Sequence, residues 1–137
     1  MLRAVIIHSL ADARAALAAA RESGAPVSVI SAPGAAAHAG AAWFDQVIRA
    51  AQAEIPEAKV NAILDCDDAA GFALGALRAG IKAIRFVGRE DVTSRLADIA
   101  AASGARLVTE PVETLDLRGH KDPASACRAW LDGDAQA

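Results

Sequence analysis

The sequence predicts an α/β fold, a single three-layer domain built around a five-stranded parallel sheet. Short apolar runs alternate five times with longer helical segments, which is the pattern of repeated β-α units. The chain has 137 residues, the length of one domain. Its 54% hydrophobic and 23% charged residues exclude intrinsic disorder. We expect the domain to cover residues 1–132 and residues 133–137 to fray.

Five short apolar runs are typical of strands buried on both faces of a sheet. Polar residues, glycine or proline bound each run, so none has the length of a buried helix. The runs are residues 3–8, 27–30, 60–64, 84–87 and 106–109.

Helix signals lie between the strands. Ser9 and Asp12 have the spacing of a capping box, and Gly24 stops the helix that follows them. The longest loop, residues 31–42, is rich in small residues and precedes a second helix that ends at Pro56.

Three further helices complete the pattern. Asp67 or Asp68 is expected to cap a third helix that ends at Gly80, and a fourth helix closes at Gly104. Asp122 is followed by proline at the first helical position, which predicts a short last helix.

Right-handed crossovers leave two ways to order such strands. We favour an open, doubly wound sheet with the flavodoxin-like order 2-1-3-4-5. The alternative is a partial βα barrel, because a full eightfold barrel needs roughly 200 residues or more.

Charge and cysteine usage narrow the class of partner. The net charge is −3 and the 14 basic residues are scattered, which argues against nucleic acid and anionic membranes as partners. No apolar run approaches the roughly 18 residues of a membrane span. Cys66 and Cys127 have no framework spacing, which favours reduced thiols and a cytoplasmic protein.

The candidate site lies at the carboxyl ends of the strands, where ligands bind in either arrangement. His8, Ser31 and Asp65 end the first three strands, and His38 lies in the long loop above this edge. The candidate catalytic residues are His8, His38 and Asp65, and the candidate ligand-binding residues are Ser31, Gly34, Asp67 and Asp68.

Each candidate also has a purely structural interpretation. The aspartates of residues 65–68 are of the type that binds Mg²⁺, but one of them is expected to cap a helix. The glycine-containing loop after Ser31 could receive a small anion, although it lacks the P-loop lysine. The dinucleotide-binding motif GxGxxG and the nucleophile-elbow motif GxSxG are both absent. The carboxylates beside Cys66 are expected to raise the pKa of its thiol and so make it a poor nucleophile. We expect no metal and no cofactor.

Two functions stay open at this point. The first is a small soluble module without catalysis, which binds a small polar ligand or a protein partner and self-associates into a homo-oligomer. The second is a small enzyme that uses Asp65 with His8 or His38 as acid/base groups on an organic or phosphorylated substrate. Trp43 and Phe44 cannot easily face one core together, so either one of them is exposed beside the long loop as a ligand lid or oligomer contact, or both belong to a broad apolar core face.

Residues 67–88 resemble a helix-strand segment of the 2-keto-3-deoxy-6-phosphogluconate aldolases. In that family the matching strand carries the lysine that forms a Schiff base, and Arg85 stands at its position here. Because a guanidinium cannot form an imine, the resemblance implies a βα unit without aldolase chemistry.

In size, and in Asp65 at the end of the third strand, the chain is also similar to response-regulator receiver domains. Receivers place an acidic pair after the first strand and a lysine before a proline in the fifth. His8-Ser9 and Glu110-Pro111 stand there instead, so phosphorylation of Asp65 is not implied.

Overall fold

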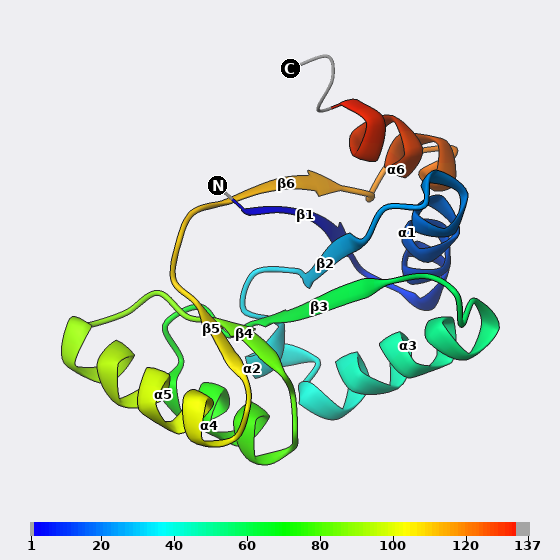
Figure 1. Cartoon of the computed structure of the whole chain (residues 1–137). Coiled ribbons are helices and arrows are strands. Elements are labelled where there is room, and N and C mark those ends of the chain that lie inside the picture. The colour runs from blue at the N-terminus through cyan, green and yellow to red at the C-terminus, as the bar shows by residue number, and fades with distance from the viewer. Residues whose placement is uncertain (1, 134–137) are drawn as a thin grey trace.

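A computed structural model describes residues 2–133, which form one sheet of six parallel strands together with six helices (Figure 1). The strands are β1 (Leu2–Ile7), β2 (Val27–Ser31), β3 (Val60–Asp65), β4 (Ala83–Arg85), β5 (Arg106–Val108) and β6 (Val112–Asp116). The helices are α1 (Leu10–Ser23), α2 (Ala35–His38), α3 (Ala41–Glu54), α4 (Ala70–Arg78), α5 (Glu90–Ala102) and α6 (Pro123–Asp132).

The α/β class and the parallel sheet are confirmed, whereas the favoured strand order is wrong. The sheet has the order β5-β4-β3-β2-β1-β6, so the first five strands follow one another in sequence. This is the order of the alternative, a partial barrel, and the sheet forms a half-barrel. The predicted number of five strands missed β6, which pairs with β1 in the register Leu2↔Val112 to Ile6↔Asp116.

The link between β5 and β6 requires the sheet to curl. These strands form opposite edges of the sheet, yet only residues 109–111 separate them (Figure 1). Four residue steps span at most about 14 Å, whereas five strand spacings in a flat sheet measure about 24 Å. The edges must therefore approach each other, and the strands enclose a concave inner face.

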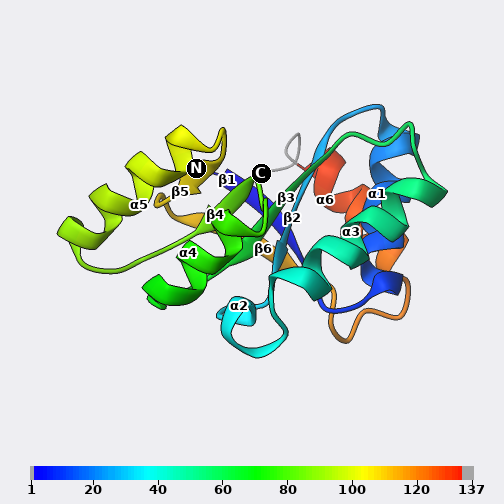
Figure 2. The same cartoon turned by 90° about the horizontal axis from the view of Figure 1, so that it is seen from below.

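The curled sheet buries apolar side chains on both of its faces. In Figure 2, α4 and α5 lie toward one end of the curled sheet and α1, α3 and α6 toward the other. All five helices contribute to the larger core, whereas strand residues alone form the smaller one. The larger core lies under these helices and includes Val5, Val29 and Leu64. The smaller core fills the inner face with Ala4, Ile30, Ile63 and Val108. Alternate residues of each strand thus serve the two cores.

The local helix signals give mixed results. Ser9 Oγ accepts a hydrogen bond from the Asp12 N–H, and Gly24 ends α1 in the left-handed conformation, as predicted. Asp122 caps α6 through the Ser125 N–H. The long loop, in contrast, contains the short helix α2. Neither Asp67 nor Asp68 caps the third helix, because the chain turns at Asp67 with a positive φ and α4 begins only after Ala69.

Residues 134–137, on which most of the predicted fraying falls, lie outside the described residues.

Gly88→Ala is expected to lower the free energy of unfolding by about 1–3 kcal/mol, because it overpacks a filled site. A Cβ at Gly88 would lie 2.6 Å from Cζ of Phe86, whose ring is buried in the core. Gly75→Ala is the matched control. Its Cβ would meet nothing within 4 Å on an exposed helix position, so it is expected to stabilise the protein by about 0.5–1 kcal/mol. Urea unfolding of both variants measures the difference, and equal effects would contradict the role of Gly88.

Candidate functional site

Two cavities adjoin at the carboxyl edge of the sheet, and Pro33 lines both. The inner cavity, about 200 Å³, opens over the concave face and is lined by Ser31, Asp65, Arg85 and Thr114 with apolar neighbours. The histidine cavity, about 240 Å³, lies beside it under the loop that contains α2. Because ligands of parallel α/β folds bind at this edge, these cavities form the candidate site.

Asp65 is the buried polar centre of the inner cavity, with 5% of its surface exposed. Its Oδ1 accepts hydrogen bonds from the N–H groups of Gly34 (3.0 Å) and Asp67 (2.9 Å). Its own N–H donates to the buried Ser31 Oγ at 2.9 Å. Asp65 therefore ties the loop after β2 to the turn after β3, and the amide of Gly34 is already occupied by a carboxylate.

Arg85 brings a cation into the same cavity. It lies opposite Asp65 in the β3–β4 register, and its Nη1 lies 3.7 Å from Asp65 Oδ2. This separation makes a loose ion pair rather than a hydrogen bond. The Nε of Arg85 is buried and has no hydrogen-bond partner among the described residues. Burying such a donor unpaired costs free energy, so the inner cavity holds unused hydrogen-bonding capacity.

The histidine cavity brings two of the predicted catalytic candidates together. His8 at the end of β1 and His38 at the end of α2 both line it. Trp43 and Arg118 complete its wall. Phe44 is fully buried in the core, and Trp43 is half-buried, packing against that core while it lines the cavity, so the two interpretations of this pair each hold in part.

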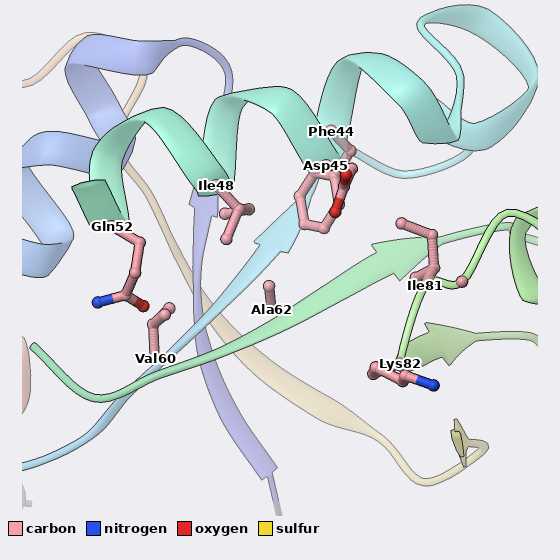
Figure 3. Close-up of a pocket in the computed structure, with 9 residues that line it drawn as sticks. Phe44, Asp45, Ile48, Gln52, Val60, Ala62, Ile81 and Lys82 are labelled. Carbon is pink, nitrogen blue, oxygen red and sulfur yellow. The ribbon is translucent and has the colours of Figure 1, made fainter. Parts of the chain in front are cut away.

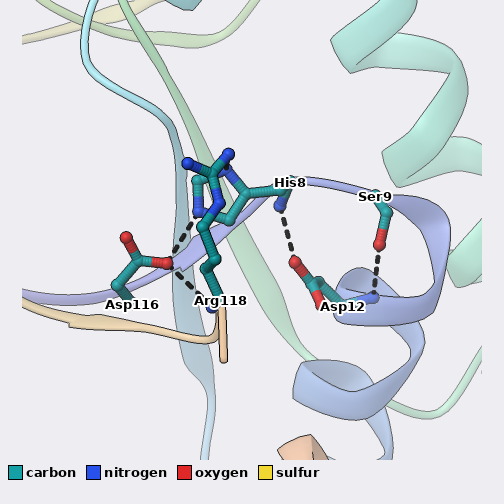
Figure 4. A network of polar contacts seen from close by, with 5 residues as sticks. All are labelled: His8, Ser9, Asp12, Asp116 and Arg118. Atoms are coloured by element: carbon teal, nitrogen blue, oxygen red, sulfur yellow. Dashed lines mark hydrogen bonds and ion pairs between the residues drawn. The ribbon is translucent and has the colours of Figure 1, made fainter. Parts of the chain in front are cut away.

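His8 is held on both ring nitrogens (Figure 4). Its Nε2 lies 2.7 Å from Asp116 Oδ1, and its Nδ1 lies 3.2 Å from Nη2 of Arg118. Arginine can only donate and a carboxylate can only accept, so Nδ1 accepts from Arg118 and Nε2 donates to Asp116. These contacts select the neutral imidazole that carries its proton on Nε2.

The surroundings of Asp116 favour its ionised form beside His8. Partial burial alone would raise the pKa of Asp116. Hydrogen bonds from the Arg118 N–H and from the His8 ring, together with the nearby charge of the Arg118 guanidinium, outweigh it and hold that pKa below its ordinary value. Asp116 is thus a carboxylate that orients the imidazole.

The structure separates the predicted site residues into two groups. His8 and His38 share the histidine cavity, and Ser31 and Asp65 share the inner cavity. Gly34 lies between them through its bond to Asp65. The side chains of Asp67 and Asp68 are exposed. Their ligand-binding roles remain predictions.

Sequence reasoning missed the polar residues supplied by β6 and the turn after it: Thr114, Asp116 and Arg118. A signal existed in the alternation of Leu115 and Leu117 with polar neighbours, which is the period of a half-buried strand. It is short and follows Pro111.

A third cavity, about 270 Å³, lies away from this edge (Figure 3). It opens between α3, β3 and the turn before β4, where Ile48, Ala62 and Ile81 face it. Its polar side chains are otherwise engaged, since Asp45 pairs with Arg49, Gln52 donates to backbone carbonyls and Lys82 donates to the Ser103 carbonyl. Its lining residues include no histidine.

The cysteines and carboxylates do not form a second site. Burial, with a smaller contribution from the charge of Asp65, raises the pKa of the Cys66 thiol to about 12. Burial, with a smaller contribution from Asp12, raises that of Cys127 to about 11. Both thiols are therefore unreactive in the folded protein. Within residues 2–133, no three His, Cys, Asp or Glu side chains are placed to share a metal ion.

The surface bears on the expected partners. No helix in the described part of the chain is long and apolar enough to cross a bilayer. The exposed face of α4 carries Phe72, which is 52% exposed, beside Gly71 and Gly75. These glycines have open space around them, so no close packing within this chain requires them. Self-association stays a prediction.

Comparison with known proteins shows the fold alone. No family model matches the sequence, and no curated protein matches it. A solved structure described as "putative fructose-1,6-biphosphate aldolase from Coccidioides immitis" is similar, with a TM-score of 0.61 and 17% identity. The similarity covers 77% of this chain and 39% of that one, so this chain spans about two-fifths of the length of that protein.

Proposed function

We propose that this protein binds a small anionic ligand, a carboxylate or a phosphate ester, at the carboxyl edge of its half-barrel. The observation that carries the proposal is the pair of arginines, Arg85 and Arg118, that line two adjoining cavities at this edge. Asp65 is the single carboxylate among the residues that line them. Asp116 lies behind His8, so the fixed charges nearly balance, and it is the hydrogen-bond donors of the two guanidinium groups that favour an anion.

The dimensions support a small ligand. Each cavity is below the roughly 300 Å³ at which pockets for drug-sized ligands begin. Ile7, Ala35 and Trp43 give the histidine cavity an apolar wall, and Arg118 gives it a charged end. A small ligand with an apolar part and one anionic group fits a cavity that has an apolar wall and a charged end. We place this function in the cytoplasm, in keeping with the two free, buried thiols.

An acid/base enzyme is the second candidate, and the hydrogen bond between His8 and Asp116 favours it. A carboxylate that orients a neutral imidazole is a frequent arrangement of a general base. In this version Asp116, rather than Asp65, is the partner of His8, and Asp65 holds the loop that carries His38. The substrate would be an anion of the same class.

Titration with inorganic phosphate and with succinate, followed by amide chemical shifts at constant ionic strength, tests the binding. We expect saturable shifts in residues 31–39 and 116–119. Arg118→Ala is expected to weaken binding about tenfold or more, because hydrogen bonds to charged groups contribute about 1.5–3 kcal/mol.

Arg128→Ala is the matched control. Arg128 is likewise a surface arginine, but it pairs with Glu22 at the end of α1, away from the carboxyl edge. Its removal is expected to leave anion binding unchanged. Equal loss in both variants would indicate general charge attraction, and the absence of saturable shifts at tens of millimolar anion would refute the proposed function.

A further inference from the structure

The two ring nitrogens of His8 have different partners. Nε2 is bound by Asp116, which is fixed in the fold, whereas Nδ1 is bound by the exposed side chain of Arg118. Asp116, which accepts from His8 Nε2, is itself fixed by the backbone N–H of Arg118 at 2.9 Å. The Nδ1 lone pair is covered only by the guanidinium of Arg118 at 3.2 Å. Nδ1 is therefore the atom on which proton transfer depends.

The backbone of His8 is held by a helix cap, and its ring is held at Nε2 by Asp116. The His8 N–H donates to Asp12 Oδ2 at 2.8 Å, and the Asp12 N–H in turn donates to Ser9 Oγ (Figure 4). This cap joins the end of β1 to the start of α1. With Nε2 held by Asp116, the contact at Nδ1 depends on Arg118.

Arg118 is placed to move. It is exposed and lies two residues after the end of β6, and its guanidinium contacts only His8 by hydrogen bond within residues 2–133. Its partner is a neutral nitrogen, whereas hydrogen bonds between a guanidinium and an anion are roughly twice as strong. An anion in the histidine cavity therefore competes successfully for Arg118.

We propose that Arg118 masks Nδ1 of His8 as a proton acceptor, and that an anionic ligand in the histidine cavity takes Arg118 and so exposes this nitrogen to the ligand itself. The inference rests on the proposed anion binding and deepens it. The ligand class is a small anion with a transferable proton within reach of Nδ1.

The proton balance is complete within the site. Nδ1 takes the proton, and the electron pair of the broken bond stays on the ligand. The resulting imidazolium carries a proton on each nitrogen and remains bonded through Nε2 to the Asp116 carboxylate, which neutralises it. His38, across the cavity, and Asp12, under the His8 backbone, are the other titratable groups that face this pair.

The ring ¹⁵N chemical shifts of the three histidines measure directly whether Nδ1 of His8 accepts a hydrogen bond from Arg118. His38→Gln and His120→Gln assign the signals. In the free protein His8 is expected to show a protonated Nε2 and a hydrogen-bonded Nδ1. Inorganic phosphate is expected to shift Nδ1 toward a free acceptor and leave Nε2 in place, and Arg118→Ala is expected to give the same shift without phosphate.

Carbethoxylation of His8 by diethyl pyrocarbonate gives a second readout. The rate is expected to rise about tenfold in Arg118→Ala, as for the loss of one hydrogen bond to a charged group, and to stay unchanged in Arg128→Ala. Phosphate that shifts the amides but leaves His8 Nδ1 unmoved would overturn the masking and leave the anion site standing. Phosphate that shifts no amide overturns both, even where Arg118→Ala moves Nδ1.

Discussion

Asp65→Ala is expected to lower the free energy of unfolding by about 2–5 kcal/mol, because two N–H groups lose their acceptor at about 1–3 kcal/mol each. The substitution leaves the N–H groups of Gly34 and Asp67 without their acceptor. It also leaves the guanidinium of Arg85 without its carboxylate. Denaturant unfolding measures the loss.

Asp65→Asn and Asp68→Ala serve as comparisons for Asp65→Ala: the first removes only the charge, and the second removes an exposed aspartate. The asparagine keeps an oxygen for the two amides and loses only the charge opposite Arg85, so its cost is expected to be smaller, about 1–3 kcal/mol. Asp68 is exposed, and its removal is expected to change stability by less than about 0.5 kcal/mol. A near-neutral Asp65→Ala would show that the bonds to the two loops contribute little to the fold.

Phe44→Ala is expected to cost about 3–5 kcal/mol, because the ring is fully buried and its loss leaves a cavity. Its neighbour Trp43 is the matched comparison, since it is only partly buried and lines the histidine cavity. Trp43→Ala is expected to cost about 1–2 kcal/mol of stability.

The variant that loses less stability, Trp43→Ala, is expected to lose more anion binding than Phe44→Ala. Trp43→Ala removes part of the apolar wall of the histidine cavity, so it is expected to weaken anion binding even where the protein is fully folded. Phe44→Ala is expected to bind normally under conditions in which it remains folded. Thermal melts and phosphate titrations on the same samples separate the two effects. Equal stability loss in both variants would contradict the division between core and cavity.

The predicted elements were found where a few neighbouring residues decide the structure. Ser9 and Gly24 bound α1, and Asp122 caps α6, because capping contacts lie within four residues. The error at Asp67 and Asp68 has a physical cause that the sequence hides. Asp65, a strand residue, takes the Asp67 amide, so the chain turns there instead of starting a helix.

The candidate site also has one part that the sequence predicted and one part that only the tertiary structure revealed. The β-α alternation by itself determined the parallel sheet and placed His8, Ser31 and Asp65 at its carboxyl edge. Only the tertiary structure decided the strand order and brought Asp116 to His8, 108 positions away in the sequence. Alternation specifies which side chains face which core, whereas pairing of distant strands depends on how far the sheet curls. That curl follows from the three-residue link into β6, and with it came Arg118, the residue on which the proposed chemistry depends.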